Sequence, residues 1–155
     1  MKTAAWIQSG LPPSIEYIAR AELFRRSAIN MADMIDVTGA PGLQQLNWPK
    51  YFLLGHAVEL ALKAVTRSFE ERTGKMPVDP MPGNHDLLGY YMAAVQAGMR
   101  QLPFDVEGIL QDLAELHKEF YARYPKERRP VMTATYFDDP TDQILLAASD
   151  MVRSR

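Results

Sequence analysis

Apolar side chains recur every three or four residues in several stretches of the chain, the spacing that places them on one face of an α-helix. The first stretch begins at Ser14, whose hydroxyl can cap a helix, and runs to about Asp36. Its apolar positions are Tyr17, Ala21, Phe24, Ala28, Met31 and Ile35. This pattern predicts a long first helix that packs along one stripe.

The clearest stripe in the sequence follows a turn-rich segment, Thr38 to Asn47. Pro49 suits the first turn of this second helix, because the N–H that proline lacks would have no partner there. The apolar positions are Leu54, Val58, Ala61, Leu62, Val65 and Phe69. We expect this to be the central helix, with its charged end at Arg72, before Gly74.

Two shorter helices are predicted after a proline-rich loop. The third begins near Asn84, which can cap it, with Asp86 in the positively polarised first turn. Its buried positions are Leu87, Leu88, Tyr91, Ala94 and Val95. The fourth is capped by Asp105 and continues to Pro125, with the stripe Val106, Ile109, Leu110, Leu113, Leu116, Phe120 and Tyr124.

The segment Lys126 to Phe137 is the least helical, because its Val, Thr and Tyr residues favour extended backbone, and it is predicted to be a loop or one short strand. Asp139 and Pro140 then start a final helix, where Asp138, Asp139 and Asp142 suit capping better than a metal ion. The chain is therefore expected to be all-α, an up-and-down bundle of about five helices, with residues 1–155 forming a single domain.

Composition narrows the classes of function. The 155 residues are 47% hydrophobic and carry a formal charge of −2, which argues against a protein that grips nucleic acid with its whole surface, although a local basic patch remains open. There is no cysteine, and so no disulfide or thiolate chemistry. No segment approaches the ~20 apolar residues of a membrane span. We expect a cytoplasmic protein without membrane contact, and with three widely separated histidines we expect no metal or other cofactor.

Three side chains that can carry chemistry lie on one side of the second helix: His56, Glu59 and Lys63. On a functional interpretation, Glu59 is a base or an orienting group and Lys63 binds a phosphate or another anion. On a structural interpretation, Glu59 and Lys63 form an ordinary ion pair four residues apart, with the acid on the favourable N-terminal side. The structural interpretation is favoured.

The start of the third helix offers a second candidate. His85 and Asp86 follow the Pro-Gly loop, and the backbone amides there could receive an anion. Alternatively, His85 packs back onto the second helix and hydrogen-bonds Glu59 or a backbone carbonyl, which would lock the two helices together.

Positive charge also gathers where the fourth helix ends. Arg123 and Tyr124 are followed by Lys126, Arg128 and Arg129, which together could hold a phosphate backbone while a tyrosine stacks on a base. The favoured alternative is a solvated loop whose cations offset the negative end of the helix dipole.

Two segments together resemble the HEPN superfamily of small helical bundles. The first runs from His56 through Glu59 to Lys63, and the second is Gly83-Asn-His85-Asp86-Leu-Leu. Their order and spacing resemble an uncharacterised branch of that superfamily, over about residues 49–124. The resemblance implies a helical bundle that forms a homodimer.

Many HEPN proteins are metal-independent ribonucleases, often toxins encoded beside an antitoxin, and carry an Arg followed a few residues later by a His. None of the three histidines here has that Arg. The resemblance therefore implies a binding or interaction module that takes RNA, a nucleotide or a protein partner, in a toxin–antitoxin or defence-type system. The alternatives are a divergent endoribonuclease, with His85, Glu59 and Arg123 brought together across a dimer, and a purely structural interaction domain.

Overall fold

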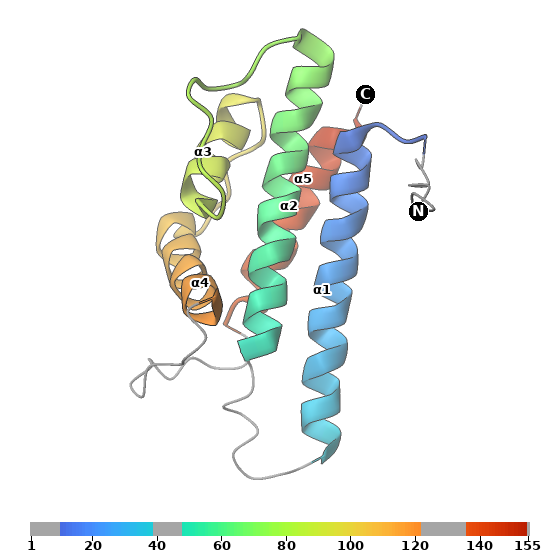
Figure 1. Cartoon of the computed structure of the whole chain (residues 1–155), viewed down its shortest axis with the longest axis vertical. Coiled ribbons are helices and arrows are strands. Elements are labelled where there is room, and N and C mark those ends of the chain that lie inside the picture. The colour runs from blue at the N-terminus through green and yellow to red at the C-terminus, as the bar shows by residue number, and fades with distance from the viewer. Residues whose placement is uncertain (1–9, 39–47, 122–135, 155) are drawn as a thin grey trace, which may run out of the picture.

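The computed structural model describes residues 10–38, 48–121 and 136–154. These residues form five α-helices and no strand (Figure 1). The predicted all-α bundle of about five helices is confirmed. The helices are α1 (Pro13–Thr38), α2 (Trp48–Thr73), α3 (Leu87–Gln96), α4 (Val106–Tyr121) and α5 (Asp138–Arg153).

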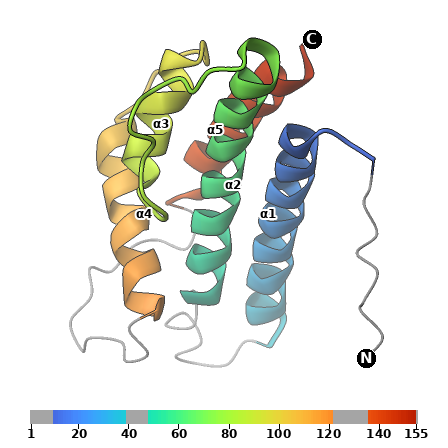
Figure 2. The same ribbon diagram turned by 45° about the horizontal axis from the view of Figure 1, so that its top comes forward.

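The second helix lies at the centre of the bundle, as its apolar stripe predicted. It packs against α1 on one side, against α3 and α4 on the other, and against α5 behind it (Figures 1 and 2). Small side chains allow this close approach, because α2 has alanines with no exposed surface at positions 57, 61 and 64. Val58, Leu62 and Val65 are equally buried and fill the space between the helices.

The buried face of α1 differs slightly from the predicted stripe. Ala21 and Ala28 are fully buried as expected, but Ile18 takes the central place and Tyr17 and Phe24 are only half-buried. The reason is that α1 packs on α5 as well as on α2. Two ion pairs join α1 to α5, Arg25 with Asp142 and Glu22 with Arg153.

The predicted capping role of Ser14 is wrong. The helix begins at Pro13, so Ser14 lies within its first turn. Its hydroxyl donates to one Glu71 oxygen at 2.7 Å and its backbone N–H donates to the other at 3.1 Å. A carboxylate from the C-terminal end of α2 therefore holds the N-terminus of α1.

The third helix begins later than predicted, at Leu87, and its cap is Asp86 instead of Asn84. The Asp86 side chain accepts a hydrogen bond from the Gly89 N–H at 2.9 Å. His85 has a positive φ of 68°, so the helix cannot continue back to Asn84. Asp105 caps α4 as predicted, accepting from Gly108 N–H at 3.0 Å.

The last helix begins at Asp138, and no side chain caps it. The expectation that its aspartates serve as caps is therefore wrong. Asp138 pairs with the buried Lys50 of α2 at 2.8 Å, and Asp142 pairs with Arg25 of α1. These carboxylates are drawn to cations on neighbouring helices.

Several predictions lie outside the described residues. They concern Arg123, Tyr124, the extension of α4 to Pro125, and all but the last two residues of the segment Lys126 to Phe137. Among the described helices, none combines the length and the apolar character that crossing a bilayer requires.

Candidate functional site

The loop between α2 and α3 brings His85 next to Glu59. After α2 ends at Thr73, the chain turns and runs back along the helix, so that it reaches the middle of α2 before α3 begins (Figure 1). Residues 26 positions apart in the sequence thus meet at one place.

Glu59 is the centre of this site. Its side chain is only 3% exposed, yet its two oxygens accept from three donors. Oε2 lies 2.9 Å from Nδ1 of His85, while Oε1 lies 2.6 Å from Nζ of Lys63 and accepts from the His85 backbone N–H at 3.3 Å. Both structural interpretations of the sequence are confirmed, the His85–Glu59 hydrogen bond and the Glu59–Lys63 pair.

The environment keeps Glu59 ionised. Burial by itself would raise the pKa of its carboxyl group, but hydrogen bonds from Lys63 and then His85 outweigh burial, and the net pKa lies below the usual value. A buried carboxylate with these partners is a fixed negative charge at neutral pH. It therefore orients the imidazole and the ammonium group beside it.

The sequence did not reveal two further contributors, Asn84 and Tyr90. The Nζ of Lys63 lies 3.4 Å from Oδ1 of Asn84 and 5.1 Å from the centre of the Tyr90 ring. In the sequence Asn84 was predicted only as a helix cap within the second motif, and Tyr90 was indistinguishable from a core residue. Together with Glu59 they position the ammonium group of Lys63.

The backbone of His85 is strained. A non-glycine residue in the left-handed region costs roughly 1–2 kcal/mol, and His85 lies there with φ 68°. The two hydrogen bonds to Glu59, one from the ring and one from the backbone, offset that cost. The imidazole side chain remains 43% exposed, so a ligand can reach it.

Asp86 does not join the site. The sequence suggested that amides at the start of α3 could receive an anion, but the Gly89 N–H already donates to Asp86. The carboxylate also fills the space beside Gly89, where an added Cβ would lie 2.3 Å from Oδ2. A second anion at this helix end would be repelled by the first, so the role of Asp86 is to cap α3.

His56 is likewise separate from the Glu59 cluster in its packing. Its ring meets Phe24 of α1 edge-on at 4.4 Å and lies parallel to Phe52 at 6.2 Å. Burial lowers the pKa of His56 below its ordinary value of 6.5, and His85 and Lys63 lower it further while Glu59 opposes them. His56 therefore serves the α1–α2 contact as a neutral ring, and its part in ligand binding stays a prediction.

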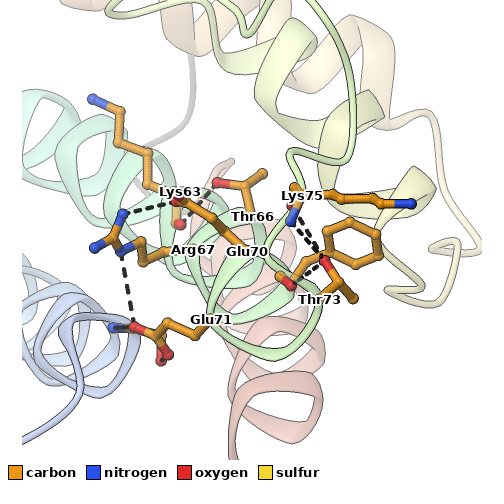
Figure 3. A network of polar contacts seen from close by, with 9 residues as sticks. Lys63, Thr66, Arg67, Glu70, Glu71, Thr73 and Lys75 are labelled. Carbon is orange, nitrogen blue, oxygen red and sulfur yellow. Dashed lines mark hydrogen bonds and ion pairs between the residues drawn. The ribbon is translucent and has the colours of Figure 1, made fainter.

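A second polar network occupies the C-terminal end of α2 (Figure 3). Arg67 lies 2.7 Å from Glu70 and 3.9 Å from Glu71, the residue that holds Ser14. Through Glu71 this network joins α2 to α1. Over residues 10–38, 48–121 and 136–154, no group of three or more acidic or histidine side chains is arranged to hold a metal ion.

In comparisons with known proteins, no family model matches this chain, and neither a curated protein nor a solved structure shows significant similarity to it. The HEPN resemblance therefore rests on the two motifs. In the structure these motifs touch, because Glu59 of the first contacts His85 of the second and Lys63 contacts Asn84.

The left-handed backbone of His85 predicts unequal effects of two truncations. Both His85→Gly and His85→Ala lose the ring hydrogen bond to Glu59, and we expect both to unfold more easily than the wild type. The free energy of unfolding of His85→Ala should be lower than that of His85→Gly by about 1 kcal/mol, because only glycine adopts a positive φ without strain. Urea unfolding followed by circular dichroism measures the difference, and equal stabilities would contradict it.

The lowered pKa of His56 predicts a loss of stability in mild acid. As the pH falls below 6.5, the unfolded chain protonates this histidine before the folded chain does, which favours unfolding until the lower folded pKa is passed. His56→Gln has no such titration. We therefore expect the melting temperature of the wild type to fall more between pH 7.5 and pH 5.5 than that of the variant. If the melting temperatures of wild type and variant fell equally with pH, burial would not lower the pKa of His56.

Proposed function

We propose that this protein is a HEPN-like binding module, active as a homodimer, that binds phosphate groups of RNA or of a nucleotide at the Glu59–His85–Lys63 site. One observation supports this above the others. A buried carboxylate holds an imidazole and an ammonium group side by side, and both retain exposed surface, 43% for His85 and 22% for Lys63.

The charges of the site suit an anion. Lys63 balances the negative charge of Glu59, so the cluster presents no net negative charge that would repel a phosphate. Lysine has three N–H donors, and the contacts to Glu59 and Asn84 use two of them. Because Glu59 already orders both partners, little conformational entropy is lost on binding.

The low net charge of the chain limits the ligand. A chain with a net charge of −2 gains little from general attraction to nucleic acid, so affinity depends on a few local contacts. This favours a nucleotide or a short single-stranded segment over a long duplex. A toxin–antitoxin or defence-type role, with a second protein as partner, follows from the HEPN resemblance.

A divergent metal-independent endoribonuclease is the second candidate, and one contact favours it. A carboxylate at Nδ1 is the arrangement that orients histidine as a general base in many enzymes, leaving Nε2 to exchange a proton with the substrate. In RNA that proton would come from the 2′-hydroxyl. The cation that such a site needs beside the histidine was sought in Arg123, which lies outside the described residues.

The binding proposal predicts that Lys63→Met weakens the affinity for a fluorescent single-stranded RNA by roughly tenfold, the equivalent of one charge-assisted hydrogen bond. Lys75→Met, which removes an exposed lysine from the loop after α2, is the matched control and should leave the affinity unchanged. Fluorescence anisotropy at several salt concentrations tests both. If the two variants bind like the wild type, phosphate binding at this site is wrong.

The two candidates differ in a cleavage assay. With chelator present, we expect neither the wild type nor identically purified His85→Ala to cut mixed single-stranded and structured RNA. Cleavage by the wild type that falls by ~10² or more in the variant would establish the ribonuclease instead, because general acid–base groups contribute factors of that size.

A further inference from the structure

The outward face of α3 has an apolar stripe without charge. From Leu87 to Met99 the sequence has no charged residue. Leu88, Met92 and Val95 are spaced to lie on one side of the helix, and Met92 is 61% exposed. The outer side of α1, by contrast, has the exposed residues Arg20 and Arg26. Leu88 and Val95 are half-buried, so Met92 is the side chain that this stripe presents for contact.

A hollow lies next to the stripe, between α3 and the start of α4. Its volume is about 340 Å³. Most of its wall is apolar, formed by Tyr91, Val95, Leu102 and Phe104, with the two glutamines Gln96 and Gln101 as polar lining. Met92 also lines it and projects beside it. The exposed Met92 side chain and the hollow therefore lie on the same face of the molecule.

Opposite charges flank the stripe. Asp86 precedes α3 and Arg100 follows it, and both are exposed. When two copies of α3 pack antiparallel, Asp86 of each copy lies at the same end as Arg100 of the other. Two pairs of opposite charge then form, one at each end. A parallel arrangement would place like charges together. The face is thus complementary to itself in the orientation that a two-fold axis imposes.

We infer that the α3 face, defined by Leu88, Met92, Val95 and the adjoining hollow, is the contact between two copies of this chain. Met92 of each copy enters the hollow of the other, and the Asp86–Arg100 pairs close the two ends. This inference rests on the homodimer of the proposed function, and specifies its interface.

Sedimentation velocity of the full chain over a wide range of concentration tests the interface. We expect a dimer for the wild type and a monomer for Met92→Asp, because a charge would have to be buried in the hollow. Leu146→Asp on α5 is the matched control, since Leu146 is 56% exposed and lies away from α3. It should stay dimeric, and circular dichroism checks that both variants are folded.

Substitutions of the two flanking charged residues test the interface independently and preserve the cap of α3. Asp86→Asn keeps a good capping residue and removes only the charge. We expect Asp86→Asn and Arg100→Gln each to raise the dissociation constant of the dimer several-fold. In the double variant this constant should rise by less than the product of the two single increases, because both changes break the same pair. Independent effects would overturn the pairing.

The remaining outcomes separate this inference from the proposed function. A wild type that dimerises but is insensitive to Met92→Asp would overturn the interface and leave the homodimer standing. A monomeric wild type that still loses RNA affinity on Lys63→Met would overturn the interface and the homodimer but leave the phosphate site. Loss of RNA binding with an intact α3 dimer would overturn the phosphate site alone.

Discussion

The buried carboxylate of Glu59 is the interaction on which the arrangement of the site depends. An ionised group at 3% exposure is costly by several kcal/mol unless its oxygens are paired. Here the donors come from Lys63 on the same helix and from the ring and backbone of His85. Since His85 lies directly before the cap of α3, satisfying this one charge also determines where the third helix begins.

The structural role and the proposed binding role depend on the same contact. The sequence offered a structural ion pair and a ligand site as alternatives, but the two are compatible, because the carboxylate that locks α2 to the start of α3 also orders the groups of the proposed phosphate site. The backbone of His85 is strained, so the His85–Glu59 contact forms at the expense of local conformational energy. Strain held by a surrounding network is common where side chains must be presented in one orientation.

Polar contacts between helices surround a core of small side chains. The alanines of α2 let four other helices approach it closely. Around that core, Glu71 holds the start of α1, and Arg25 and Lys50 pair with aspartates of α5. The outer face of α3 takes no part in these pairs, because residues 87–99 include no charged side chain.

The sequence by itself determined the features that depend on neighbours within one or two helical turns. These are the five helices, the central position of the second, the Asp105 cap and the Glu59–Lys63 pair, because helical periodicity brings residues three and four apart together. It also suggested the His85–Glu59 contact as one of two alternatives. Only the tertiary structure decided that Glu71 binds Ser14, that Asp86 instead of Asn84 caps α3, and that His56 packs between phenylalanines. Those choices depend on how far the loop returns along α2 and on which helices lie side by side, and spacing along the chain carries no such information.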